Sequence, residues 1–205
     1  MNEIGAASVG YLLGAIPFAY LITRARLGID IRTVDIGNAG AGSVIRTVGL
    51  GAGVLTLVGD VGKGVAAVLV AQLLGVGFYW VLASGMLAVL GHVFPVFIGF
   101  RGGQGVATAM GVFFALAPIA MGLTLVAMGL VLLVNLGKRA SRRLFFIVAC
   151  CAPLLPVFVY VIDRSLPLVI YTLVVVGFIA VRNWRRLRHP RTITHRLLGE
   201  MDDSA

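Results

Sequence analysis

Residues 91–108 read GHVFPVFIGFRGGQGVAT, and they join the end of one long apolar run to the start of the next. Because glycines leave backbone amides uncovered and adopt positive φ, the segment from Arg101 to Gly105 is able to curl around an anion. The residues from Gly105 to Ala117 predict a short helix, whose N-terminus would direct further N–H groups toward the same place. The same glycines are also typical of a tight turn between packed membrane helices, so neighbouring motifs must decide between the two interpretations.

The composition of the chain excludes soluble fold classes. Of its 205 residues 60% are hydrophobic and only 12% are charged, about half the charged share of a soluble domain. Apolar runs long enough to cross a bilayer as helices follow one another along the sequence. We therefore predict an all-α integral membrane protein, a compact bundle of about seven transmembrane helices in a single domain covering residues 1–205. The expected spans are 4–22, 53–74, 79–98, 105–117, 119–136, 144–162 and 166–182, followed by a basic tail at about residues 183–205.

The basic residues set the expected orientation in the membrane. A net charge of +9 would suit a nucleic-acid partner, but the lysines and arginines concentrate between the apolar runs, as the positive-inside pattern predicts. With the N-terminus outside and the C-terminus cytoplasmic, fifteen of the seventeen basic residues lie inside, leaving Arg164 in an outside loop and Lys63 within a span. This distribution argues against nucleic acid and places residues 99–105 on the cytoplasmic side.

A second glycine-rich segment lies in the first cytoplasmic loop of this topology. Residues 30–46 read DIRTVDIGNAGAGSVIR, and Gly37, Gly40 and Gly42 are spaced as a backbone nest for an anion would be. The spacing is not that of a dinucleotide fingerprint, and no predicted strand precedes it. A polar connector is the alternative interpretation, although a connector rarely needs Asn38 or so many glycines.

Asp60, Lys63 and His92 are ionisable residues within or beside the predicted spans. A spacing of three residues places Asp60 and Lys63 on one helical face, where they can pair, and charges at this depth usually face protein or a water-filled cavity. The sequence is compatible with either a packing role or a site role for His92. The adjacent pair Cys150-Cys151 lacks metal or redox spacing and is interpreted as structural, and no cluster of residues predicts a metal site.

Two glycine-rich loops that carry arginines on one face of a helical bundle predict an anionic headgroup bound at the cytoplasmic interface. The apolar body of the protein would hold a hydrocarbon chain beside it. A reaction that joins a soluble phosphate compound to an acyl chain suits this arrangement.

These motifs resemble those of a bacterial membrane family, the acyl-phosphate:glycerol-3-phosphate acyltransferases of the PlsY type, over nearly the whole chain. Residues 91–108 are similar to the family's G-H-x-x-P-x-F-x-x-F-K-G-G-K-G-V-A-T, and residues 30–46 to its D-x-R-x-x-G-S-G-N-x-G-A-T-N-x-x-R. Asp60 and Lys63 fall on its D-x-x-K-G element, and the tail resembles its H-R-x-N-I-x-R-L motif. The chain departs from these patterns at Asp35, Ile36, Gly42 and Ser43, where the family has Gly, Ser, Thr and Asn, and at Arg101 and Gln104, which replace the two lysines of the second loop.

The resemblance implies transfer of an acyl group from acyl phosphate to the 1-hydroxyl of glycerol 3-phosphate, giving lysophosphatidate and phosphate. It implies no cofactor, and as partners only these small molecules and membrane lipid, in the bacterial cytoplasmic membrane with the active face cytoplasmic. Neither the residues nor the resemblance indicates an oligomeric state. A divergent relative that binds lipid or phosphate without catalysis, and a small transporter, are the alternatives that the sequence leaves open.

The resemblance also implies roles for individual residues. Asn38 would orient the reacting groups, and His92, Asp35, His195 or the substrate phosphate would accept the proton. Asp60 and Thr108 would orient the site. The expected phosphate-binding residues are Gly37, Gly40, Ser43, Arg46, Lys63, Arg101, Gly102, Gly103, Gln104, Gly105 and Arg196.

Overall fold

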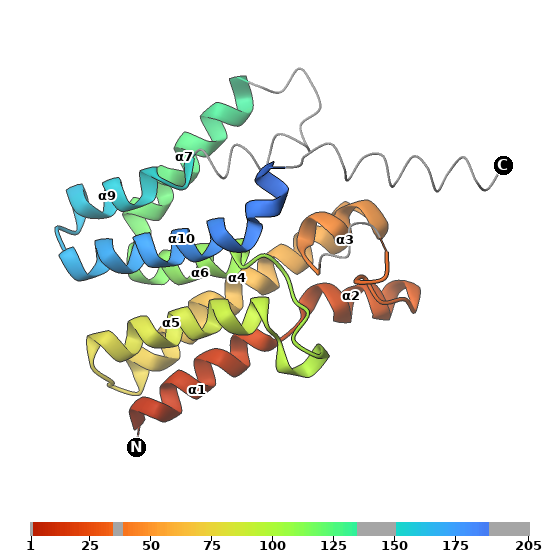
Figure 1. The fold of residues 1–205 in the computed structure, drawn as a ribbon, viewed down its shortest axis with the longest axis horizontal. Coiled ribbons are helices and arrows are strands. Elements are labelled where there is room, and N and C mark those ends of the chain that lie inside the picture. The colour runs from red at the N-terminus through yellow and green to blue at the C-terminus, as the bar shows by residue number, and fades with distance from the viewer. Residues whose placement is uncertain (1, 35–38, 135–150, 189–205) are drawn as a thin grey trace.

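The computed structural model describes residues 2–34, 39–134 and 151–188, and every regular element in these ranges is a helix (Figure 1). The elements are α1 (Asn2–Ala15), α2 (Phe18–Leu27), α3 (Ala41–Thr47), α4 (Leu50–Leu73), α5 (Phe78–Val93), the 3₁₀ helix η1 (Val96–Ile98), α6 (Val106–Leu116), α7 (Pro118–Val134), α9 (Leu154–Ile162) and α10 (Leu166–Arg188). The all-helical class predicted from the composition is confirmed for these residues.

Four segments of the described chain are long and apolar enough to cross a membrane: Asn2–Leu27, Leu50–Leu73, Phe78–Ile98 and Leu166–Trp184. The helices α6 and α7 are apolar but shorter, as the sequence predicted for the first of them. The count of about seven crossings stays a prediction.

The two ends of the bundle differ. Figure 1 places the N-terminus and the α4–α5 and α9–α10 connections at one end, and α3 with the segment between α5 and α6 at the other. The described residues of the two glycine-rich loops, within 30–46 and 91–108, therefore lie at one end of the molecule, which is the arrangement that a shared site requires.

The predicted first span, 4–22, is not continuous. The helix α1 ends at Ala15, and α2 begins at Phe18 after Ile16 and Pro17. Proline lacks a backbone N–H and its ring disfavours helical geometry in the residue before it, which explains a break at this position. Prolines also bound later elements: Ala152 and Pro153 form a turn inside the predicted span 144–162, and Pro118 begins α7.

The helices α1, α4, α5 and α6 approach one another closely because small residues face each other across their interfaces. A Cβ atom added to Gly14 of α1 would collide with the backbone of Ala88 in α5, and one added to Gly64 of α4 would collide with the backbone of Thr108 in α6. Van der Waals contact of this kind is the main source of helix association in lipid. The rigid four-helix unit formed in this way carries the polar groups described next.

Candidate functional site

A buried cluster of ionisable side chains lies where α4 and α5 pass the break between α1 and α2. Lys63 Nζ lies 2.8 Å from Asp60 Oδ1, so the pairing predicted from their spacing is confirmed. His92 Nδ1 lies 3.3 Å from the same oxygen, at an angle outside hydrogen-bonding geometry. Because all three side chains are buried, their charges and protons are protected from bulk water.

Lys63 also binds the backbone at the break between α1 and α2. Its Nζ donates a hydrogen bond of 2.8 Å to the carbonyl oxygen of Ile16, which the break frees from helical pairing. The ammonium group lies 5.7 Å from the centre of the Phe18 ring, within the range of a cation–π contact. Asp60 and the carbonyl of Ile16 thus occupy two of the three N–H bonds of the Lys63 ammonium group. At most one N–H bond is left for the phosphate contact that the sequence predicted.

The second glycine loop folds back onto the end of α5. The amide of Gly102 donates to the carbonyl of Val93 at 3.2 Å, and the amide of Gly103 donates to that of His92 at 3.1 Å. A Cβ on Gly103 would collide with His92 Nε2 and lie 2.8 Å from the carbonyl oxygen of Ala39 in the first loop. Glycine at this position therefore allows three segments of the chain to touch.

This arrangement makes the next two amides of the loop the candidates for binding an anion. Among the described residues, no protein acceptor pairs with the amides of Gln104 and Gly105. Gly105 has φ +86° and directly precedes α6, whose first-turn N–H groups have no partner within the helix. Arg101 is exposed at the start of this stretch and Gln104 is half-buried in it. The loop thus offers backbone donors, a helix N-terminus and one guanidinium to an anion.

The first glycine loop is partly helical, which the sequence did not predict. After Gly40, which caps it in an extended conformation, α3 carries Ser43 and Arg46 on one face. Arg46 Nη2 donates to Ser43 Oγ at 3.2 Å, and Ser43 is fully buried. Arg46 is exposed, and α3 lies at the same end of the bundle as the segment between α5 and α6 (Figure 1), so α3 supplies a second cation at that end.

The remaining predicted residues fall into two groups. Thr108 is fully buried on α6, and its Oγ1 has no partner within the described residues. Asp35, Gly37, Asn38 and Arg196 lie outside the described residues, as does His195. No group of three potential metal ligands occurs in the part of the chain that the structure describes.

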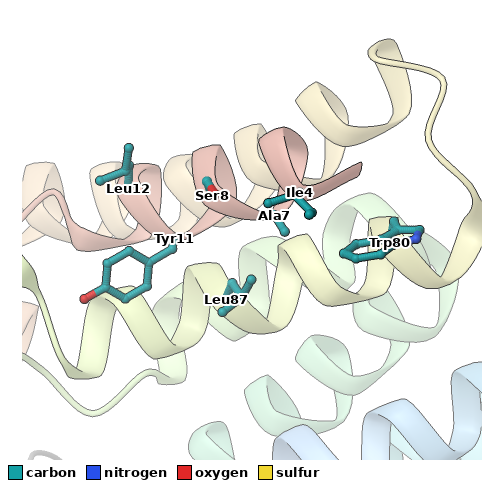
Figure 2. Close-up of a pocket in the computed structure, with 7 residues that line it drawn as sticks. All are labelled: Ile4, Ala7, Ser8, Tyr11, Leu12, Trp80 and Leu87. Atoms are coloured by element: carbon teal, nitrogen blue, oxygen red, sulfur yellow. The ribbon is translucent and has the colours of Figure 1, made fainter. Parts of the chain in front are cut away.

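The ionisable cluster borders a small cavity, and a separate groove lies along α1 and α5. A cavity of about 10 Å³ lies among Asp60, Lys63, His92 and Gly103, large enough for about one water molecule. A groove of about 450 Å³ lies between α1 and α5, and Figure 2 shows the side chains that line it: Ile4, Ala7, Ser8, Tyr11, Leu12, Trp80 and Leu87. Its walls are mostly apolar, and the hydroxyl of Tyr11 donates to the carbonyl of Phe94 at 2.8 Å, beside the second loop.

The chain is similar to proteins of known activity. Residues 4–195 match the family model described as glycerol-3-phosphate acyltransferase. A glycerol-3-phosphate acyltransferase of Geobacter sulfurreducens is 42% identical over 192 residues, covering 92% of this chain and 95% of the relative. The crystal structure of PlsY (YgiH), an integral membrane glycerol 3-phosphate acyltransferase, superposes in its glycerol 3-phosphate form with a TM-score of 0.82 at 30% identity, over 94% of this chain and 93% of that one. Its lysophosphatidic acid form gives a TM-score of 0.79 at 29% identity over the same shares.

Proposed function

The chain belongs to the glycerol-3-phosphate acyltransferase family and is a membrane enzyme of that activity, and from this premise we propose that its acyl donor is an acyl phosphate. The 1-hydroxyl oxygen of glycerol 3-phosphate attacks the acyl carbon, the bond from that carbon to the phosphate oxygen breaks, and the hydroxyl proton passes to a base. The products are lysophosphatidate and inorganic phosphate. Because the donor is already an activated mixed anhydride, positioning and charge stabilisation supply the acceleration without a covalent enzyme intermediate.

The observation that carries this proposal is the set of anion-binding groups at one end of the bundle. Arg101, the open amides of Gln104 and Gly105, and the N-terminus of α6 converge on one loop. A leaving phosphate gains negative charge as the acyl bond breaks, so donors fixed in advance lower the barrier. Arg46 on α3, whose guanidinium is held by the buried Ser43, supplies a second position for a phosphate, so each of the two substrates has its own cation.

His92 is the base that this geometry favours. Its Nδ1 faces the carboxylate of Asp60, while its Nε2 faces Gly103 in the loop. Asp60 is held in place by Lys63 and stabilises an imidazolium that forms when Nε2 takes the hydroxyl proton through a water in the adjoining cavity. In this assignment Asp60 and Lys63 orient the base, and Asn38 and Asp35 are left to orient the hydroxyl.

The apolar groove between α1 and α5 is our proposed site for the hydrocarbon chain. Its volume lies in the range of ligand pockets, and its mostly apolar walls suit methylene groups (Figure 2). We place the enzyme in the bacterial cytoplasmic membrane, with the glycine loops on the cytoplasmic face and the N-terminus outside.

The donor is tested with purified protein in detergent, supplied with glycerol 3-phosphate and either palmitoyl phosphate or palmitoyl-coenzyme A. We expect phosphate release and lysophosphatidate only with palmitoyl phosphate. Turnover with the coenzyme A ester and none with the phosphate would overturn the proposed donor while leaving the acyltransferase activity in place.

A further inference from the structure

The guanidinium of Arg32 joins two segments that the reaction needs close together. Its Nη1 donates to the carbonyl of Ile98, the last residue of η1. Ile98 directly precedes the second glycine loop, whereas Arg32 belongs to the first loop. The contact therefore bridges 66 residues of sequence at the end of the bundle that holds the site.

The rest of the guanidinium is fixed within its own loop. Nε donates to Asp30 Oδ1 and Oδ2 at 3.0 Å each, and Nη2 lies 2.6 Å from Oδ2. The hydrogen bonds from Arg32 hold the pKa of Asp30 below its usual range, so the pair stays charged at neutral pH. The guanidinium carbon also lies 5.4 Å from the centre of the Tyr20 ring, which restricts it from the side of α2.

The backbone around Arg32 is anchored as well. The amide of Arg32 donates to Asp30 Oδ1 at 2.9 Å, and the amide of Thr33 donates to the carbonyl of Asp30 at 3.0 Å, forming a tight turn. Ile31 is fully buried in a small core with Ala19, Ala39 and Val44. Because Val44 lies on α3, a displacement of this turn is transmitted to the helix that carries Ser43 and Arg46.

We propose that Arg32 is a positioning residue, which sets the placement of the first glycine loop and α3 relative to the second loop. Its charge is neutralised by Asp30, and each of its three guanidinium nitrogens already donates to Asp30 or Ile98, so it acts through Arg46 and Arg101 and not by touching the substrate. This inference rests on the proposed phosphate site, because it concerns how the two halves of that site are held.

The test compares Arg32→Ala, Arg32→Lys and Arg24→Ala in the full-length protein. Arg24 is the matched control, since it also lies over the Tyr20 ring, at 6.0 Å, and is exposed. We measure kcat and KM for glycerol 3-phosphate, and separately the rise in thermal stability that glycerol 3-phosphate produces in detergent. If a binding site loses its preorganisation while its reacting groups remain, KM rises about tenfold and kcat changes less than about threefold.

We expect Arg32→Ala to show this split and to lose most of its stabilisation by glycerol 3-phosphate, with its ligand-free stability close to that of the parent. Arg32→Lys should recover part of both effects, because an ammonium keeps the charge but not the planar set of donors. Arg24→Ala should behave as the parent. A normal KM in Arg32→Ala, or a fall in kcat at unchanged KM, would overturn the positioning role, and so would an equal effect of Arg24→Ala.

Arg46→Ala, measured in the same series, separates this inference from its premise, because Arg46 is the cation proposed for glycerol 3-phosphate. A normal response of Arg46→Ala to glycerol 3-phosphate would overturn the proposed site for that substrate. A lost response in Arg46→Ala with a normal response and KM in Arg32→Ala would overturn only the role of Arg32.

Discussion

At the scale of single residues, the two cations Arg101 and Lys63 have different surroundings. Lys63 is enclosed, with Asp60 and the Ile16 carbonyl as partners, whereas Arg101 is exposed at the mouth of the second loop. A guanidinium can grip a phosphate through two parallel hydrogen bonds. We therefore propose that Arg101 supplies the charge used in catalysis and that Lys63 has a structural role.

The first prediction concerns Arg101. Loss of one preorganised oxyanion donor costs about 2–4 kcal/mol, so Arg101→Ala should lower kcat/KM with acyl phosphate by roughly 30- to 1000-fold. Thermal stability in detergent should hardly change, because the side chain is exposed. Arg26→Ala, which removes an exposed arginine of α2, is the control and should keep full activity. If Arg101→Ala keeps near-normal activity, the second glycine loop is only a structural turn.

The second prediction concerns Gln104, which stands where the resembling motif has a lysine. A glutamine offers a neutral amide, and a lysine offers a charge-assisted hydrogen bond of about twice the strength. Gln104→Lys should therefore raise kcat/KM measured by phosphate release, since the side chain is half-buried beside the open amides. A loss of activity in Gln104→Lys, with unchanged stability, would mean that the loop has been rebuilt around glutamine.

The third prediction concerns the buried ion pair. Lys63→Met removes the partner of a buried carboxylate, which typically costs 3–5 kcal/mol, roughly the whole margin of a marginally stable protein. We expect a large drop in the unfolding midpoint in detergent. The double variant Asp60→Asn with Lys63→Met should recover much of it, because no unpaired charge remains. Equal stability of the single and double variants would show that the Asp60 carboxylate still has a compensating partner after Lys63 is removed.

At the scale of elements, the glycines of α4 separate into those that pack and those that do not. A Cβ on Gly64 would collide with the backbone of Thr108, while one on Gly62 would meet nothing within 4 Å. The two positions lie in the same helix, so the helix-forming advantage of alanine is common to both. Any difference between them reports the α4–α6 interface.

The fourth prediction follows from this comparison. Gly64→Ala should destabilise the protein by about 1–3 kcal/mol through overpacking, and should lower activity because α6 carries the loop amides at its N-terminus. Gly62→Ala should be neutral or slightly stabilising. Unfolding in detergent and the acyl phosphate assay measure both. Equal stability and activity of the two variants would show that the α4–α6 interface accommodates an added methyl group without destabilising the protein.

The sequence predicted most elements of this fold, and its failures have local causes. Apolar runs predicted the starts of α4, α5, α6 and α10 and the ends of α4 and α6 to within a few residues, because length and composition alone define a membrane helix. The predicted ends of α5 and α10 were less accurate, since α5 ends earlier, at Val93, and α10 ends later, at Arg188. The break at Pro17 was missed because the flanking residues remain apolar, so hydropathy does not register it. The helix α3 was missed because glycines in an anion-binding loop and glycines before a short helix look alike in sequence.

The site was predicted less completely than the fold. The spacing of Asp60 and Lys63 predicted their contact, but no local pattern could show that Lys63 also holds the Ile16 carbonyl. The same holds for Arg32, because no local pattern could show its bond to the distant carbonyl of Ile98. Contacts between distant segments depend on tertiary packing, which one sequence does not reveal.

At the scale of the whole molecule, the proposed site requires both glycine loops on one side of the membrane. The helix α5 leads into the second loop, and α6 leads away from it, while the first loop follows the broken helix formed by α1 and α2. Figure 1 places α3 and the segment between α5 and α6 at the same end of the bundle, opposite the connection between α9 and α10. This arrangement and the positive-inside distribution of arginines together predict one orientation, with the loops in the cytoplasm.

The last prediction tests that orientation with single cysteines in a background in which Cys150 and Cys151 are replaced by serine. Gly42→Cys and Gln104→Cys report the two loops, and Ser165→Cys reports the α9–α10 connection. A membrane-impermeant maleimide should label the first two only in inside-out vesicles and the third only in right-side-out vesicles. Acyl phosphate should slow labelling of Gln104→Cys, because the side chain lies beside the amides proposed to hold its phosphate, but it should leave Ser165→Cys unaffected. Labelling of Gly42→Cys and Gln104→Cys from opposite sides would separate Arg46 from Arg101 by the width of the bilayer, and no single site could then bind both substrates.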